Sequence, residues 1–142
     1  SVVKSIQLHT GGMCNLDAAM TKQGVEALGT DGVELAILEN VGNLVCPAEF
    51  DTGAVKNVMI LSVPEGDDKP LKYPLMFKVS DVVLINKIDV LPYFDFDVEK
   101  CKEYIKHRNP NAKIFLICAK TGEGIEEWAT WLNDEVREWI DK

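Results

Sequence analysis

Two short polar stretches of the chain have the residue types and spacing of a guanine-binding site. The first, Asn86-Lys87-Ile88-Asp89, directly follows the apolar run Val82–Ile85. An aspartate accepts hydrogen bonds from N1 and the exocyclic amine of guanine, a donor pair that adenine lacks, so we expect Asp89 to discriminate between these bases. We expect the Lys87 stem to lie along the base and Asn86 to tie the loop to its neighbours. Four residues alone are a weak signal, and the bland alternative is a polar turn that caps the next helix.

A second polar loop, one predicted strand later, supports the guanine interpretation. It reads Cys118-Ala119-Lys120-Thr121-Gly122. This run resembles the Ser-Ala-Lys loop of GTPases, in which backbone groups and the lysine complete the base pocket. We therefore expect Ala119 and Lys120 to line the same nucleotide pocket as the first loop.

An acid and a glycine three residues apart follow another apolar run, Leu35–Leu38. The segment Glu39-Asn40-Val41-Gly42 occupies the place of the Asp-x-x-Gly segment of many GTPases. A glycine there lets its backbone N–H approach a γ-phosphate closely, and a carboxylate can hold a magnesium-bound water. We expect Glu39 and Gly42 to act in catalysis at the γ-phosphate. The bland alternative is a strand-end turn with an exposed glutamate.

One part of a GTP-hydrolysing site is missing from these 142 residues. No glycine in the chain is followed by lysine, so the Gly-x-x-x-x-Gly-Lys-Ser/Thr phosphate loop is not present. That loop normally cradles the phosphates and supplies both the lysine and the magnesium-binding hydroxyl. We therefore expect that this chain alone does not hydrolyse GTP at a useful rate.

The polar loops require strands to position them, and the apolar pattern predicts five strands and three helices. The predicted strands are Val2–Leu8, Leu35–Leu38, Val58–Val63, Val82–Ile85 and Ile114–Ile117, and the predicted helices are Asn15–Leu28, Val98–His107 and Glu123–Ile140. Short apolar strands separated by helices predict an α/β fold with a mostly parallel sheet covered on both faces. Ligands of such sheets bind beyond the carboxyl ends of the strands, where Glu39, Asn86 and Ala119 fall.

The composition predicts a single globular domain, residues 1–142, of which 46% are hydrophobic. No apolar run approaches the roughly 18 residues of a membrane span, and the first residues lack the long apolar core of a signal peptide. The four cysteines show no dense disulfide spacing. We therefore expect a cytoplasmic protein with no membrane partner. The net charge of -8 argues against nucleic acid as a partner.

Four segments together resemble the hydrogenase nickel-incorporation GTPases, known as hydrogenase maturation protein B. They read HTGGMCNLDA, ENVGNLVCPAEFD, EGDDKPLKYPLMF and VLINKID. The resemblance covers essentially the whole chain and implies a P-loop NTPase-like, SIMIBI-type three-layer fold. It also implies GTP or GDP binding with Mg²⁺, homodimerisation, and delivery of Ni(II) to the large subunit of [NiFe] hydrogenase with other maturation proteins. Family members carry the phosphate loop further towards the N-terminus, so the chain corresponds to the C-terminal two-thirds of their GTPase domain, truncated at the N-terminus.

The resemblance assigns Cys14 and Cys46 as the ligands of Ni(II) or Zn(II). Thiolates bind both metals well, and a two-fold dimer would bring four of them to its axis. Family members carry a histidine directly after the first cysteine, where this chain has Asn15. That difference removes an imidazole ligand from the implied site. The bland alternative for a lone cysteine is a small buried hydrophobe, which we favour for Cys101 and Cys118.

Two other functions fit parts of the same pattern. A non-hydrolytic metal-storage module of the same fold would bind metal without responding to GTP. The related urease nickel-insertion GTPases carry a Cys-Pro-His motif, whereas Cys46-Pro47 is followed here by Ala48.

Cys46 also lies four residues after Gly42, so a loop drawn toward a γ-phosphate would move the cysteine. This spacing motivates the hypothesis that nucleotide state and metal geometry are coupled.

Overall fold

The computed structural model describes residues 3–12, 16–40 and 42–142 of the chain. It divides into two compact units, Ser1–Val55 and Lys56–Lys142, each of which is described by itself. Among the described helices, none has the length and apolar character needed to cross a lipid bilayer.

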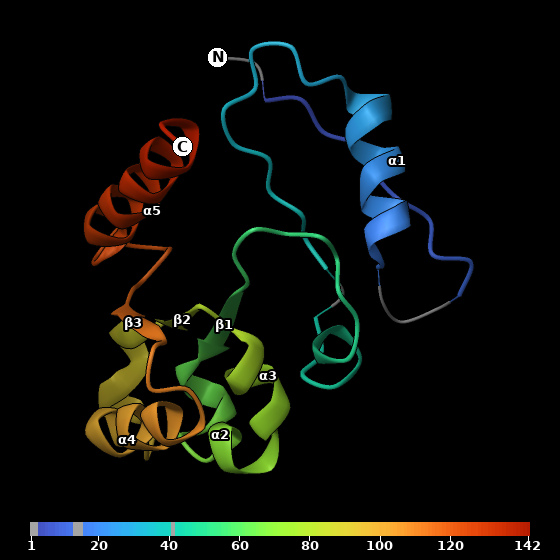
Figure 1. The fold of residues 1–142 in the computed structure, drawn as a ribbon. Helices are drawn as coiled ribbons and strands as arrows, with labels where there is room; N and C mark the ends of the chain where they lie inside the picture. Colours follow the sequence, from blue (N-terminus) through green and yellow to red (C-terminus); the bar gives the residue numbers. More distant parts are fainter. Residues whose placement is uncertain (1–2, 13–15, 41) are drawn as a thin grey trace. The chain divides into compact units, whose positions relative to one another are not determined.

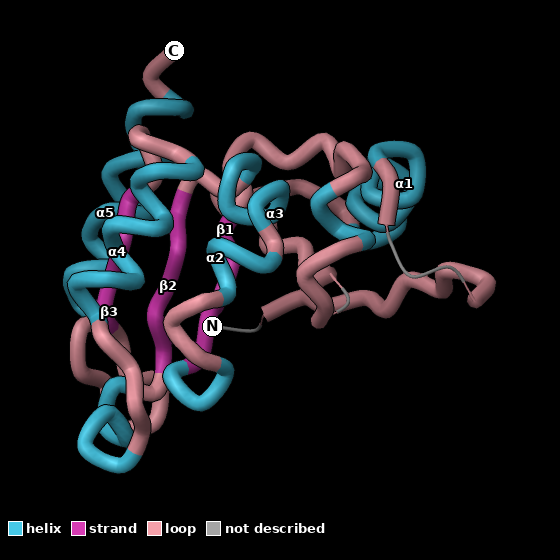
Figure 2. Tube along the Cα trace, turned by 90° about the horizontal axis from the view of Figure 1, so that it is seen from below, coloured by secondary structure: helices cyan, strands magenta, loops and turns pink. Residues whose placement is uncertain are grey.

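A three-stranded parallel sheet forms the centre of the C-terminal unit. Its strands are β1 (Val58–Ser62), β2 (Val82–Asn86) and β3 (Lys113–Leu116). Their spatial order is β1-β2-β3, so β2 is the central strand (Figure 2). Ser62 lies opposite Asn86, and Leu84 lies opposite Phe115. Because the strands run in the same direction, their carboxyl ends meet at one edge of the sheet.

Helix α5 (Ile125–Ile140) covers one face of this sheet. Leu84 of β2 and Phe115 of β3 form a buried cluster against Trp128 and Trp131 of the helix. The Phe115 ring centroid lies 5.6 Å from that of Trp128 and 6.0 Å from that of Trp131, and the two indoles stack at 5.7 Å. Aromatic pairs at such distances contribute roughly 0.5–1.5 kcal/mol beyond their burial. The three rings therefore fix α5 over the strands that carry the polar loops.

Three further helices belong to the other side of the sheet. They are α2 (Lys69–Lys72), α3 (Pro74–Val79) and α4 (Val98–Arg108). Phe77 of α3 is fully buried, as are Cys101 and Ile105 of α4 and the strand residues Leu61 and Ile85. Neighbouring residues of a strand point to opposite faces, so Ile85 lies on the face away from α5. The unit thus has three layers, with α2, α3 and α4 grouped away from α5 (Figure 1).

The N-terminal unit is built differently. Its described elements are helix α1 (Ala18–Leu28) and a 3₁₀ turn, η1 (Cys46–Ala48). Asp17 caps α1, because its Oδ1 accepts a hydrogen bond from the backbone N–H of Met20 at 2.8 Å. Leu8 packs against Gly24, where an added methyl group would approach the leucine side chain to 2.9 Å. Outside these elements the described backbone of this unit is irregular.

The secondary structure predicted for the C-terminal unit is confirmed in type and order. Strand β2 and helix α4 each extend one residue beyond the predicted end, β3 is shifted by one residue, and α5 begins at Ile125. Strand β1 ends at Ser62 because a 3₁₀ turn, η2 (Val63–Glu65), begins there. The short helices α2 and α3 were not predicted, since their prolines suggest loops, although proline also suits the first turn of a helix.

Two predicted strands of the N-terminal unit are wrong. The described residues of Val2–Leu8 and all of Leu35–Leu38 have no strand structure. A strand requires a neighbouring chain for its backbone hydrogen bonds, and within the described residues neither segment has a ladder partner. Leu35 and Ile37 are 44% and 81% exposed instead of buried. The helix predicted from Asn15 begins at Ala18; Asn15 itself lies outside the described residues.

The predicted burial of β1 on both faces is also wrong. Met59 and Leu61 are buried, but Val58 and Ile60 are 41% and 56% exposed. The aromatic cluster under α5 covers β2 and β3, so the side chains of β1 on that face remain accessible. The central strand, β2, is therefore the strand of this sheet whose side chains are buried on both faces.

Candidate nucleotide site and cysteine loop

The loop Asn86–Asp89 lies at the carboxyl edge of the sheet, where β2 ends. Asn86 is the last residue of β2, and Lys87 follows with φ of 65°, in the left-handed region that non-glycine residues rarely adopt. A 3₁₀ helix, η3 (Ile88–Tyr93), then carries Asp89 in its first turn. The side chains of Lys87 and Asp89 are exposed. This sharp reversal leaves a cation and a carboxylate accessible at the open end of the sheet.

Two hydrogen bonds connect this loop to the chain that follows β3. The Asn86 Oδ1 accepts a hydrogen bond from the backbone N–H of Ala119 at 3.1 Å. The backbone N–H of Ile88 donates to the carbonyl oxygen of Ile117 at 3.3 Å. The first contact is the tie expected of Asn86. The two loops predicted to form one base pocket are therefore adjacent and held in register.

The second loop closes on itself through its own backbone. The N–H of Cys118 donates to the carbonyl of Glu123, and the N–H of Gly122 donates to the carbonyl of Cys118, both at 2.8 Å. Cys118 is buried, while Ala119 and Lys120 are exposed at the tip. The buried Cys118 anchors the loop, so the exposed Lys120 and the backbone of Ala119 are held in defined positions.

The capping alternative for Asp89 finds no support. The next helix, α4, has Asp97 as its N-cap, whose Oδ1 accepts a hydrogen bond from the backbone N–H of Lys100 at 3.0 Å. No side-chain cap is made at the start of η3. The Asp89 carboxylate is thus not used to satisfy a helix end and remains available for a ligand.

Sequence reasoning did not identify the polar residues that shape the neighbouring strand end. The Ser62 and Glu65 side chains form a capping box, in which Glu65 Oε2 accepts from the N–H of Ser62 at 2.6 Å. The Asp67 carboxylate accepts from the N–H of Asp97 at 2.7 Å and so connects the segments that follow β1 and η3. The Ser-x-x-Glu spacing was a readable signal for the first of these contacts. The second joins residues 30 positions apart and had no local signal.

The residues predicted to act at the γ-phosphate belong to the N-terminal unit. Glu39 and Gly42 are exposed and lie in irregular backbone. The strand expected to deliver Glu39 is not formed, so its position after a strand end, which supported the prediction, is not observed. Their proposed role therefore depends on sequence spacing alone.

Cys46 begins the 3₁₀ turn η1 in the same unit and is half-buried. The Asn43 Oδ1 accepts hydrogen bonds from the backbone N–H groups of Val45 at 3.0 Å and of Cys46 at 2.9 Å. Cys14, the other predicted metal ligand, lies outside the described residues. Within the described part of the chain, no three His, Cys, Asp or Glu side chains are clustered for a metal ion.

The two remaining cysteines are structural. Cys101 and Cys118 are 0% and 1% exposed. Burial, with a smaller contribution from the nearby Asp67 carboxylate, raises the pKa of Cys101 to about 12. Its thiol is therefore protonated at neutral pH and is a poor metal ligand, which agrees with its predicted role as a small buried hydrophobe.

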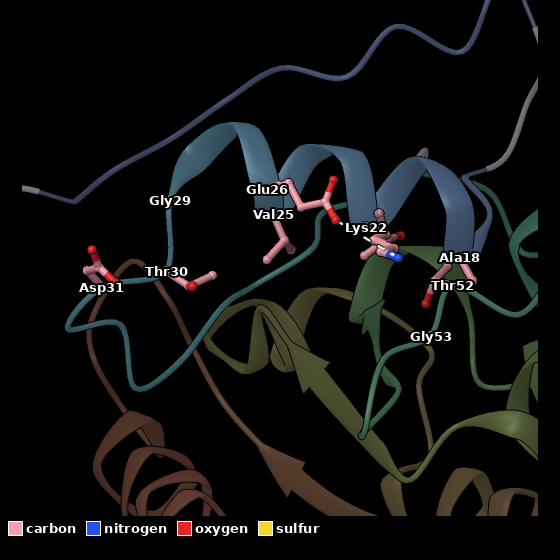
Figure 3. A pocket seen from close by; sticks show the side chains of 10 residues that line it. Ala18, Lys22, Val25, Glu26, Gly29, Thr30, Asp31, Thr52 and Gly53 are labelled. Carbon is pink, nitrogen blue, oxygen red and sulfur yellow. Dashed lines mark ion pairs between the residues drawn. The ribbon is translucent and has the colours of Figure 1, made fainter.

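A separate hollow beside α1 contains none of the predicted site residues. Its walls include Val25, Thr30 and Thr52, and the ion pair between Lys22 Nζ and Glu26 spans 4.0 Å beside it (Figure 3). Both charged side chains are largely exposed, so this pair stabilises the helix very little. We assign no chemistry to this hollow.

Comparison with known proteins agrees with this geometry. A family model described as "CobW/HypB/UreG, nucleotide-binding domain" matches residues 1–116. The hydrogenase maturation factor HypB of Azotobacter chroococcum is 52% identical over 131 residues, which are 92% of this chain and 43% of that protein. The chain spans about half the length of the curated relatives it matches.

Two solved structures share the fold. HypB from Archaeoglobus fulgidus is 42% identical with a TM-score of 0.83, over 89% of this chain and 67% of that one. HypB from Helicobacter pylori in complex with nickel is also 42% identical, with a TM-score of 0.88 over 94% of this chain and 64% of that one. The predicted P-loop NTPase-like α/β fold and the resemblance to maturation proteins of this type are thereby confirmed.

Replacing Gly124 by alanine is expected to destabilise the second loop more than the same change at Gly122. Both glycines have positive φ, of 73° and 85°, where alanine costs about 1–2 kcal/mol. At Gly124 the added methyl group would also overlap the Leu116 carbonyl oxygen, whereas at Gly122 it meets no atom within 4 Å. Overpacking of this kind adds roughly 1–3 kcal/mol. Urea unfolding of both variants measures the difference, and equal losses would refute the close approach.

Cys101 is expected to resist thiol reagents in the folded chain up to about pH 9. With a pKa of about 12, the thiolate is about one part in ten thousand at pH 8. Because the folded chain holds this proton more tightly than the unfolded one, the free energy of unfolding should decrease as pH rises above about 9.

A Cys14→Ser variant titrated with a chromogenic disulfide reagent gives the measurement. We expect one fast thiol, Cys46, and two that react only in guanidinium chloride. Rapid labelling of Cys101 in the folded variant at pH 8 would contradict the burial.

Proposed function

The chain belongs to the CobW/HypB/UreG nucleotide-binding domain family, and from this premise we propose that it is the guanine-recognising and nickel-binding part of a hydrogenase maturation GTPase. The single observation that carries the proposal is the hydrogen bond between Asn86 and Ala119, which joins the two base loops. In this proposal Asp89 accepts hydrogen bonds from the guanine edge. Lys87 and Lys120 lie along the base, and the Ala119 backbone completes the pocket.

The nickel ion is the cargo of the proposed protein. Cys14 and Cys46 of two copies would supply four thiolates at a dimer axis, a set that suits Ni(II) or Zn(II). The half-buried position of Cys46 on a turn fixed by Asn43 supports this role, since a ligand needs both access and a defined direction. We propose the large subunit of [NiFe] hydrogenase and other maturation proteins as the partners.

We further propose that Glu39 and Gly42 sense a γ-phosphate and its magnesium ion. Carboxylates suit magnesium-bound water, and a glycine N–H suits a phosphate oxygen. The chain contains no Gly-Lys pair, so the groups that would neutralise the triphosphate are not among these residues. Nucleotide binding, nickel binding and their coupling are therefore the activities we assign to the chain itself.

Replacing Asp89 by asparagine should exchange guanine for xanthine specificity. The variant loses an acceptor for the guanine amine, and because hydrogen bonds to charged groups contribute about 1.5–3 kcal/mol, GDP affinity should fall about ten- to a hundredfold. Xanthine has a carbonyl in place of that amine, which the asparagine amide can donate to, so XDP affinity should rise.

Calorimetric titration of the purified chain with GDP, XDP and ADP measures these affinities. Asp95→Asn, an exposed aspartate of the same connection, is the matched control and should leave all three unchanged. Equal affinity of the unmodified chain for ADP and GDP, or no GDP binding at millimolar concentration, would defeat the guanine assignment.

Anaerobic titration of the reduced chain with Ni(II) should give thiolate-to-nickel charge-transfer absorption that saturates near half a metal per chain. Cys14→Ala and Cys46→Ala should each abolish the band, because a shared site loses half of its ligands. Cys101→Ala should retain it, since that thiol is buried and protonated.

Repeating the nickel titration with GTP and Mg²⁺ distinguishes a nickel protein that responds to nucleotide from a metal-storage module. A shift of the nickel affinity would support coupling. Nickel binding that GTP leaves unchanged would instead identify a metal-storage module, and wild-type nickel binding by Cys46→Ala would exclude the cysteine site.

A further inference from the structure

The outer edge of β3 offers backbone hydrogen-bonding groups to a partner. Within the described residues β3 pairs with β2 alone and ends the sheet on that side (Figure 2). On the side that faces β2, the N–H of Lys113 donates to the carbonyl oxygen of Asp81 at 2.9 Å, and the N–H of Ile117 donates to that of Ile85 at 2.8 Å. Alternate residues of a strand direct their backbone groups to opposite sides. The N–H and C=O of Ile114 therefore face the open side.

A groove of about 750 Å³ runs between this edge and helix α5. Its lining includes the buried Phe115, the half-buried Ile114 and the half-buried Trp131. The Trp131 ring stacks on the ring of Trp128, and this contact orients one wall of the groove. The result is an apolar floor placed directly beside an open strand edge.

Carboxylates surround this apolar floor. Glu126, Glu127 and Asp134 line the groove from α5, and all three are exposed. None of them takes part in an ion pair among the described residues. One cation, Lys113, lies at the start of β3. With three acids against one lysine, the rim attracts a positively charged ligand.

We propose that the β3–α5 groove binds an extended, lysine- or arginine-bearing segment of a partner protein, which adds a strand alongside β3. An added strand satisfies the open backbone groups, and its alternate side chains face the same side. On the side toward α5, the aliphatic stems of lysine or arginine would cover Trp131 while their charged ends reach Glu127 and Asp134. A second copy of this chain is a poor occupant of this groove, because it brings the same acidic rim to the strand edge.

The test uses a fluorescein-labelled probe peptide, acetyl-Val-Lys-Val-Lys-Val-Lys-amide, in fluorescence anisotropy with the full chain. Two matched peptides replace lysine by glutamate or methylate alternate backbone nitrogens. We expect saturable binding of the lysine peptide alone, since the glutamate peptide is repelled and the methylated peptide cannot pair with the strand. Equal binding of the glutamate or methylated peptide would overturn the proposal.

Charge variants separate the groove from the general acidity of the surface. Glu127→Gln with Asp134→Asn should weaken the lysine peptide about three- to tenfold, in the range of two exposed ion pairs. Glu103→Gln with Glu138→Gln removes the same charge from exposed helix positions outside the groove and should change nothing. Equal weakening by both double variants would mean non-specific attraction and would refute the assigned surface. Unfolding curves of the unmodified chain and the two double variants confirm that these exposed changes leave the fold intact.

Backbone amide hydrogen exchange identifies the strand that is used. Peptide binding should protect the N–H groups of Ile114 and Leu116 and leave that of Val83, in the central strand, unchanged. Binding without protection at Ile114 and Leu116 would place the peptide elsewhere and overturn the proposal. Protection of both amides in the peptide-free chain, with dimers in sedimentation velocity, would assign the edge to a second copy instead and would equally refute the partner segment.

Discussion

The burial of strand β2 on both faces is the constraint on which the C-terminal unit depends. Val82, Val83 and Ile85 are fully buried, and Leu84 is 5% exposed. A strand of this kind must have helices above and below it and strands on both sides. Helix α5 supplies one face with its tryptophans, and α3 and α4 supply the other through Phe77 and Ile105. The first polar residue after this apolar run, Asn86, is thereby fixed at the carboxyl edge of the sheet.

From that position Asn86 organises two loops with one side chain. Its Oδ1 accepts a hydrogen bond from the backbone N–H of Ala119, and two residues later the backbone N–H of Ile88 donates to the carbonyl oxygen of Ile117. Both contacts cross from the end of β2 to the end of β3, so the exposed Lys87 and Asp89 are held beside the second loop before any ligand arrives. Such preorganisation reduces the conformational entropy that binding must overcome. It gives a physical reason for the order of residues, with an amide first and, three positions later, the carboxylate that we propose contacts the base.

The sequence predicted the C-terminal unit well because its signals are local or strongly apolar. The run Val82–Ile85 is short, apolar and mostly β-branched, which is typical of a buried strand, and the pattern from Ile125 onward has one consistent helical face. The two base loops were predicted from the Asn-Lys-x-Asp spacing and the resemblance to a Ser-Ala-Lys loop, each placed at a strand end. The contact between Asp67 and Asp97 could not be predicted, since it joins distant loops. The nucleotide and metal roles of individual residues remain predictions that the experiments above address.

The same apolar pattern wrongly predicted a strand at Leu35–Leu38, because a strand forms only when it pairs with a neighbouring strand. Leu35 and Ile37 have the composition of a buried strand, yet they are exposed and irregular, with no ladder partner among the described residues. The apolar pattern indicates a preference for strand structure. The strand forms only beside a neighbouring segment whose backbone groups are free to pair with it.

The cysteine turn that follows is held locally instead, by Asn43 and its hydrogen bonds to the N–H groups of Val45 and Cys46. Asn43 is the residue directly after Gly42. Under the proposed function, a phosphate that drew in the Gly42 backbone would therefore displace Asn43, and the two hydrogen bonds would carry Cys46 with it. Coupling between nucleotide and metal then requires no strand at Leu35–Leu38, because the side chain of one asparagine transmits the movement.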